Sequence, residues 1–131
     1  MSHAPFALAG RRLLTPEGER PGAVILRDGK IAGIAAPNEL PKGLPVTDAG
    51  SAIIMPGLVD THVHVNEPGR AEWEGFSTAT QAAAAGGITT ILDMPLNSSP
   101  VTTTREAFAK KRAAAADKLS VDCGFVGGVI P

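Results

Sequence analysis

Two histidines stand one residue apart in the segment Asp60-Thr61-His62-Val63-His64. The apolar residues around them predict a β-strand, and successive side chains of a strand point to opposite faces. Asp60, His62 and His64 are therefore expected on one face. Imidazole is the commonest metal ligand at neutral pH, so a pair held by strand geometry can bind one divalent cation with little ordering cost.

A structural role is the alternative for these histidines. An isolated His-x-His pair is more often a pair of surface or hydrogen-bonded side chains. Here the pair follows Pro56-Gly57 inside an apolar strand, where two unpartnered imidazoles would be costly to bury. This context favours His62 and His64 as metal ligands, whereas His3, near the N-terminus, has no such context.

Two ligands do not complete a metal site. A hydrolytic zinc site takes about three protein ligands plus a water molecule. Asp60 is a candidate for orienting an imidazole from outside the ligand set. Asp93, at the end of the next predicted strand, is a weaker candidate for the same role, and capping of the following loop is its alternative.

From Gly57 onward, the sequence alternates between strand and helix patterns. Apolar runs predict strands over residues 58–65, 88–94 and 121–126, and the segments between them predict helices over 72–85 and 104–118. Strands separated by helices imply parallel pairing, so the fold class is α/β. Such folds build their sites at the carboxyl ends of the strands, where the two histidines lie.

The two predicted helices have different sequence signals. In the first, helical spacing predicts one packed face made of Trp73, Phe76, Thr80 and Ala83. Gly86-Gly87 is typical of a helix end. In the second, Thr103 and Glu106 have the spacing of a capping box at the helix start.

Before Pro56, the pattern predicts a small antiparallel β unit. Its short strands are expected at 6–8, 12–14, 23–27 and 30–34, with a further strand at 52–55. Asp28-Gly29 predicts a hairpin turn, because both turn positions need a positive φ. Prolines and glycine between 37 and 45 predict a loop. We therefore expect two domains, residues 1–56 and residues 57–131.

Composition narrows the function classes. The 131 residues are 44% hydrophobic and 19% charged, which is typical of a globular protein. A net charge of −1 and the lack of a basic run argue against a nucleic-acid partner. The apolar runs are shorter than the roughly 20 residues of a membrane span, and no secretory signal is recognisable, which predicts a cytoplasmic protein. Cys123 lies in an apolar stretch, which predicts a buried and unreactive thiol.

Taken together, these residues resemble the motifs of the amidohydrolase superfamily, in its cyclic-amidohydrolase branch, and most closely those of allantoinases. The resemblance covers essentially the whole chain. It rests on MPGLVDTHVH at 55–64, NEPGRAEWEGF at 66–76, AAAAGGITT at 82–90 and DMPLNSSP at 93–100.

The resemblance implies a fold. Residues 57–131 would be the first three βα units of a (β/α)₈ barrel, and residues 1–56 would be part of a small β-sandwich that precedes it. In such enzymes the complete barrel belongs to a homo-oligomer, expected here as a homotetramer. The chain would therefore be an N-terminal portion, inactive alone.

The resemblance also implies a chemistry. His62 and His64 would bind one of two divalent ions, usually zinc, and a carboxylated lysine that bridges the ions would lie beyond Pro131 together with the catalytic aspartate. Lys110, Lys111 and Lys118 precede the third strand and are not that lysine. The reaction would be metal-assisted hydrolysis of a cyclic amide, and for allantoinases it opens the hydantoin ring of allantoin to allantoate in purine catabolism.

Asn66 distinguishes among relatives. Dihydroorotases typically carry an arginine at this position, and a guanidinium suits a substrate carboxylate. The neutral amide of Asn66 instead suits an uncharged ureido or imide group, and allantoin has no carboxylate. Asn66 is therefore a candidate substrate-binding residue, with a loop turn as the alternative.

Two other functions stay open. One is a dihydropyrimidinase, hydantoinase or dihydroorotase relative, which shares the metal chemistry and differs in substrate. The other is a short non-catalytic protein, such as a remnant or an assembly protein.

Overall fold

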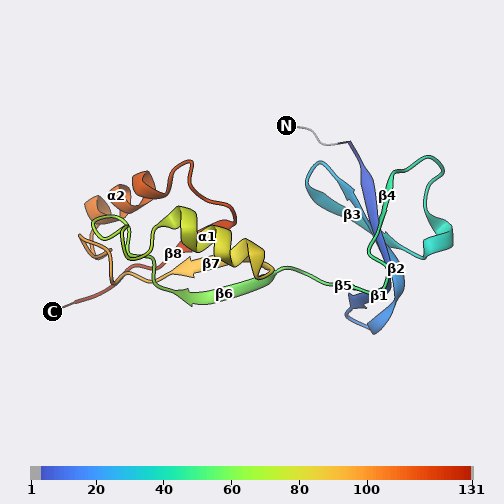
Figure 1. Cartoon of the computed structure of the whole chain (residues 1–131), viewed down its shortest axis with the longest axis horizontal. Coiled ribbons are helices and arrows are strands. Elements are labelled where there is room, and N and C mark those ends of the chain that lie inside the picture. The colour runs from blue at the N-terminus through green and yellow to red at the C-terminus, as the bar shows by residue number, and fades with distance from the viewer. Residues whose placement is uncertain (1–3, 131) are drawn as a thin grey trace. The chain divides into compact units, whose positions relative to one another are not determined.

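The computed structural model describes residues 4–130, and the chain forms two compact units, Met1–Pro56 and Gly57–Pro131 (Figure 1). The first unit contains strands, one 3-10 turn and no α-helix among its described residues. Its elements are β1 (Phe6–Thr15), β2 (Gly18–Arg27), β3 (Lys30–Ala35), η1 (Pro37–Glu39), β4 (Val46–Asp48) and β5 (Ile53–Ile54). The second unit alternates strands and helices: β6 (Leu58–Val63), α1 (Phe76–Ala85), β7 (Ile88–Asp93), α2 (Arg105–Ala115) and β8 (Asp122–Phe125).

The sheet of the first unit has the order β3-β2-β1-β4, with β5 also paired to β1. β1 and β3 run antiparallel to β2, but β4 and β5 run parallel to β1. The prediction of a purely antiparallel unit is therefore wrong. A strand that runs parallel to its neighbour must be reached by a crossover connection. The segment between β3 and β4, which the sequence predicts to be a loop, completes the connection to β4.

One strand replaces two of the predicted ones. The runs at 6–8 and 12–14 both belong to β1, whose register against β2 shifts between Gly10 and Leu13. Such a bulge absorbs extra residues without ending the strand. The predicted hairpin turn between β2 and β3 is confirmed, with φ of 51° at Asp28 and 72° at Gly29.

The second unit has a parallel sheet in the order β6-β7-β8, which confirms the α/β class. Side chains from the helices and from β7 meet in a single core cluster, so both helices cover the same face of the sheet (Figure 1). The buried members of this cluster are Val65, Phe76, Ala83, Ile91 and Ala115. The strands are one or two residues shorter than predicted, which leaves His64 and Val65 just beyond β6.

The first helix begins later than predicted. α1 starts at Phe76, and Trp73 lies in the preceding turn with 68% of its surface exposed, so its assignment to the packed face is wrong. The guanidinium of Arg70 stacks on its ring, 5.4 Å from the centroid. Phe76, Thr80 and Ala83 are buried as predicted.

The reason for this start lies upstream of the helix. Gly75 at the N-cap has no side chain to accept a hydrogen bond. The Glu67 carboxylate accepts one from the Phe76 N–H instead, at 3.1 Å. A cap contributed from eight residues before the N-cap leaves no signature in local spacing.

The second helix is capped one residue later than predicted. The Thr104 hydroxyl, not that of Thr103, accepts from the Ala107 N–H at 3.1 Å. Across residues 4–130, no helix has the length and apolar character needed to span a membrane.

Candidate metal centre

The two histidine rings converge. Their Nε2 atoms lie 3.3 Å apart, with ring centroids 5.2 Å apart, and both side chains are exposed. A tetrahedral zinc ion with Zn–N bonds of about 2.0–2.1 Å separates two ligand nitrogens by about 3.3–3.4 Å. The donor set and its spacing therefore suit one divalent cation.

The same spacing also suits a hydrogen bond between the rings, if one Nε2 carries a proton and the other does not. Binding a cation would replace that bond, because a ligating nitrogen must be deprotonated. Metal ligation by His62 and His64 stays a prediction. Among residues 4–130, no group of three or more His, Cys, Asp or Glu side chains is close enough to form a metal site.

An irregularity in β6 helps to bring the rings together. Asp60 pairs with Ile91 and Val63 pairs with Asp93, so β6 holds one more residue than β7 in this interval. A bulge of this kind bends a strand and re-aims its side chains. His62 lies inside it, and the spacing of the motif alone does not show it.

Asp60 acts on the backbone of this bulge. Its Oδ1 accepts from the His62 backbone N–H at 3.1 Å. Asp60 thus shapes the chain at His62, and its orientation of an imidazole ring stays a prediction.

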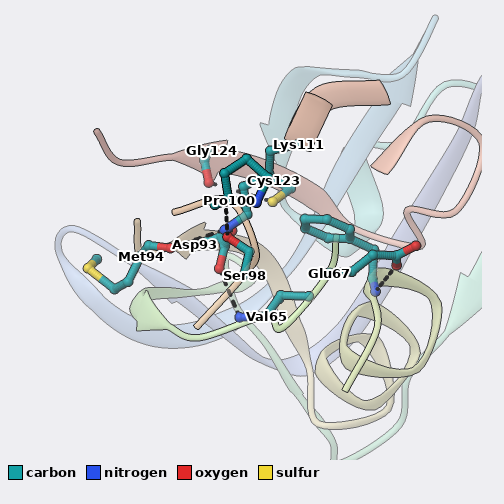
Figure 2. A network of polar contacts seen from close by, with 10 residues as sticks. Val65, Glu67, Asp93, Met94, Ser98, Pro100, Lys111, Cys123 and Gly124 are labelled. Atoms are coloured by element: carbon teal, nitrogen blue, oxygen red, sulfur yellow. Dashed lines mark hydrogen bonds and ion pairs between the residues drawn. The ribbon is translucent and has the colours of Figure 1, made fainter. Parts of the chain in front are cut away.

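Asp93 lies at the carboxyl end of β7 with 1% of its surface exposed. Its Oδ1 accepts from the Val65 N–H at 2.8 Å, and its Oδ2 forms an ion pair with Lys111 Nζ at 2.5 Å (Figure 2). Lys111 Nζ also donates to the Met94 carbonyl at 3.2 Å. Burial raises the pKa of Asp93, and the hydrogen bonds from Lys111 and Val65 and the positive charge of Lys111 oppose this rise.

Lys111 is the side chain that sequence reasoning missed. It lies on α2, and only 1% of its surface is exposed. A signal was present, since Ala107, Lys111 and Ala115 recur every four residues and all three are buried. That spacing places Lys111 on the packed face of the helix.

Asn66 follows His64 by two residues and is buried, with 8% of its surface exposed. Its N–H donates to the Glu74 carbonyl at 3.0 Å, and its carbonyl accepts from the Arg70 N–H at 3.1 Å. Its Oδ1 is buried without a hydrogen-bond partner among the described residues. The backbone contacts stabilise the loop, and substrate binding by Asn66 stays a prediction.

The Glu67 carboxylate contacts both the start of α1 and the segment that follows α2. It caps α1, as described above, and also forms an ion pair with Lys118, which follows α2. Local spacing gave no indication of this role.

The remaining candidates lie elsewhere. Cys123 is partly buried in β8, and burial raises the pKa of its thiol to about 11. A thiol with so high a pKa is protonated at neutral pH, as expected for an unreactive cysteine. His3 lies outside the described residues.

Comparison with known proteins defines the class. Residues 53–131, more than half of the chain, match the amidohydrolase family, and the chain belongs to that family. Members of this family and its hydantoinase neighbours generally depend on divalent metal ions.

Within this class, the chain is similar to allantoinases. It is 54% identical over 132 residues to the allantoinase of Streptomyces avermitilis, covering 100% of this chain and 30% of that protein. It is 44% identical over 135 residues to the allantoinase of Arabidopsis thaliana, covering 100% of this chain and 27% of that protein. The predicted resemblance is confirmed, and the chain spans less than a third of the length of these relatives.

Solved structures support the fold. The L-hydantoinase (dihydropyrimidinase) of Arthrobacter aurescens matches with a TM-score of 0.82 and 35% identity, over 96% of this chain and 28% of that one. A D-hydantoinase matches with a TM-score of 0.78 and 29% identity, over 97% of this chain and 28% of that one.

Proposed function

We propose that this chain contributes the first metal-binding strand of a cyclic amidohydrolase that opens the hydantoin ring of allantoin to allantoate. The observation that supports allantoin as the substrate is the 54% identity to an allantoinase along the whole chain. The hydantoinase structure of similar fold is only 35% identical. The convergence of the His62 and His64 nitrogens supports the metal-dependent class.

His62 and His64 would hold one of two zinc ions. The bound metal would supply the Lewis acidity that polarises a ring carbonyl and lowers the pKa of a water molecule. The chain's own contribution is two neutral nitrogen donors already within 3.3 Å of each other, on a backbone held at His62 by Asp60. Asn66 would offer its amide to the uncharged ureido group of the substrate.

The second unit would be the first part of a (β/α)₈ barrel. Its parallel sheet with both helices on one face supports this, because a barrel carries all its helices on the outside. The first unit would be part of a small β-sandwich, and the whole protein a homotetramer. The bridging lysine, the later histidines and the catalytic aspartate would come from residues outside this chain.

The experiment is an assay of the whole protein that carries this sequence, with allantoin and dihydrouracil as competing substrates. Hydrolysis of allantoin, lost in His62→Ala and in His64→Ala, is the expected result. Preference for dihydrouracil would favour a hydantoinase or dihydropyrimidinase, the second candidate, which the solved structures support. Activity retained in both histidine variants would contradict the metal role.

A further inference from the structure

A buried ion pair lies at the carboxyl end of β7 and is hydrogen-bonded to the residue that follows His64. Asp93 and Lys111 are each 1% exposed, and their charged atoms lie 2.5 Å apart. Taking two charges out of water is costly unless both are also hydrogen-bonded. Both are, since Asp93 accepts from the Val65 N–H and Lys111 donates to the Met94 carbonyl.

Two hydrogen bonds attach the residues on either side of His64 to the end of β7. The residue before it, Val63, accepts from the Met94 N–H at 2.7 Å. The residue after it, Val65, donates to Asp93 at 2.8 Å. The backbone on both sides of His64 is thus attached to the end of β7, and Lys111 in turn holds that end through Met94 (Figure 2).

We propose that Asp93 is a positioning residue that keeps the His64 imidazole in its ligand orientation through the backbone of Val65, and that Lys111 balances the charge of Asp93. This inference rests on the proposed metal role of His62 and His64. It assigns different supports to the two histidines, because His62 is held locally by Asp60. Within the ion pair, Asp93 supplies the hydrogen-bond acceptor for the Val65 N–H, and Lys111 balances the charge of Asp93.

The hydrogen-bond acceptor is the part of Asp93 that matters for His64. An asparagine keeps an oxygen at this place, and an alanine does not. Removing an outer partner of a metal ligand typically weakens metal affinity about 10–100-fold. We therefore expect the double variant D93N/K111M to bind metal within about twofold of the unmodified chain, and D93A/K111M to bind about 10-fold more weakly or worse.

The test is a Zn²⁺ titration of the whole protein that carries this sequence, prepared without metal and followed by the ring resonances of His62 and His64 in NMR. The ring resonances report coordination directly and do not depend on catalysis. Thr80→Val is the matched control, because Thr80 is buried and its hydroxyl connects α1 to the Ser120 N–H, at 3.0 Å, without touching the histidine segment. This control should lose stability and keep its Zn²⁺ affinity.

The outcomes separate the two proposals. Unchanged affinity in D93A/K111M overturns the positioning role, and so does an equal loss in Thr80→Val, which would indicate a general effect of stability. If D93A/K111M does not fold, D93N/K111M keeps the proposal falsifiable, because a 10-fold loss there would make charge and not the hydrogen bond responsible and would overturn the positioning role. A His62→Ala chain that binds Zn²⁺ as before would instead contradict the proposed function.

Discussion

β6 and β7 are neighbours in one sheet and have opposite environments. β6 is an edge strand, and none of its six residues is buried, whereas β7 lies between two strands and buries Ile91 and Asp93. The proposed ligands belong to the exposed strand and the residue that follows it. The backbone on either side of His64 is attached to Asp93 and Met94 at the end of the buried strand, whereas His62 is held by Asp60 of β6 itself. Exposure gives a ligand access to a cation, and burial gives its support rigidity.

The largest stability loss is expected where the buried strand meets α2. Lys111→Met removes one partner of a buried ion pair and leaves Asp93 with an unbalanced charge. Breaking such a pair costs about 3–5 kcal/mol of unfolding free energy. Urea unfolding followed by circular dichroism at 222 nm measures it, since the α-helices of the described chain both lie in the second unit.

The deficit of this variant should depend on pH. Burial already raises the pKa of Asp93, and the variant loses the opposing effect of Lys111. A carboxyl with a raised folded-state pKa stabilises the fold when protonated, and that stability is lost as the pH rises through this pKa. The difference in unfolding free energy between Lys111→Met and the unmodified chain should therefore become smaller as the pH falls. A difference that grows as the pH falls would contradict the burial of Asp93.

Ile91→Ala probes the packed side of β7. Ile91 is 1% exposed and belongs to the core cluster of the second unit. Replacing a buried isoleucine by alanine costs about 2–5 kcal/mol, from lost burial and the cavity left behind. The same urea titration measures the change, and a loss below about 1 kcal/mol would mean that this core is loosely packed.

Cys123 extends the comparison to β8, where it pairs with Ile91. Burial raises the pKa of its thiol to about 11, so the thiolate is scarce at neutral pH. Relative to an ordinary cysteine with a pKa near 8.5, we expect iodoacetamide to react on the order of a hundredfold more slowly at pH 7.5. Mass spectrometry measures the rate, with the urea-unfolded chain as the control, and equal rates in the two states would contradict burial of the sulfur.

The elements of the second unit were predictable, because period-two and helical spacings survive wherever one face is packed. Phe76, Thr80 and Ala83 show this in α1. Trp73 shows the limit, since it has the right spacing but precedes the helix start set by Glu67. Local spacing carries no information on a cap that comes from a distant residue.

The candidate site also has one part that the sequence predicts and one part that it does not. His62 and His64 stand in one short motif, so their types and spacing could be recognised directly. The pairing of Asp93 with Lys111 joins a strand end to the middle of a helix, and only the fold brings them within 2.5 Å. An ionic partner of this kind cannot be found from sequence spacing unless the packed face of the helix is already known.

Leu58→Ala is the matched change on the exposed strand and should have the smallest effect. It removes about as much apolar volume as Ile91→Ala, but 50% of the Leu58 surface is already exposed. We expect a cost of about 1 kcal/mol or less in the 131-residue chain, because burial stabilises only in proportion to the area removed from water. A loss as large as that of Ile91→Ala would remove the contrast between the two strands.

The same substitution also tests the proposed barrel. In a closed (β/α)₈ barrel every strand has two neighbours, so β6 would no longer be an edge strand in the whole protein. Leu58 would then be buried by the added strand, and the cost of Leu58→Ala should rise to about 2–5 kcal/mol there. Equal costs in the chain and in the whole protein would mean that nothing packs against this edge of β6, and the barrel proposal would fail.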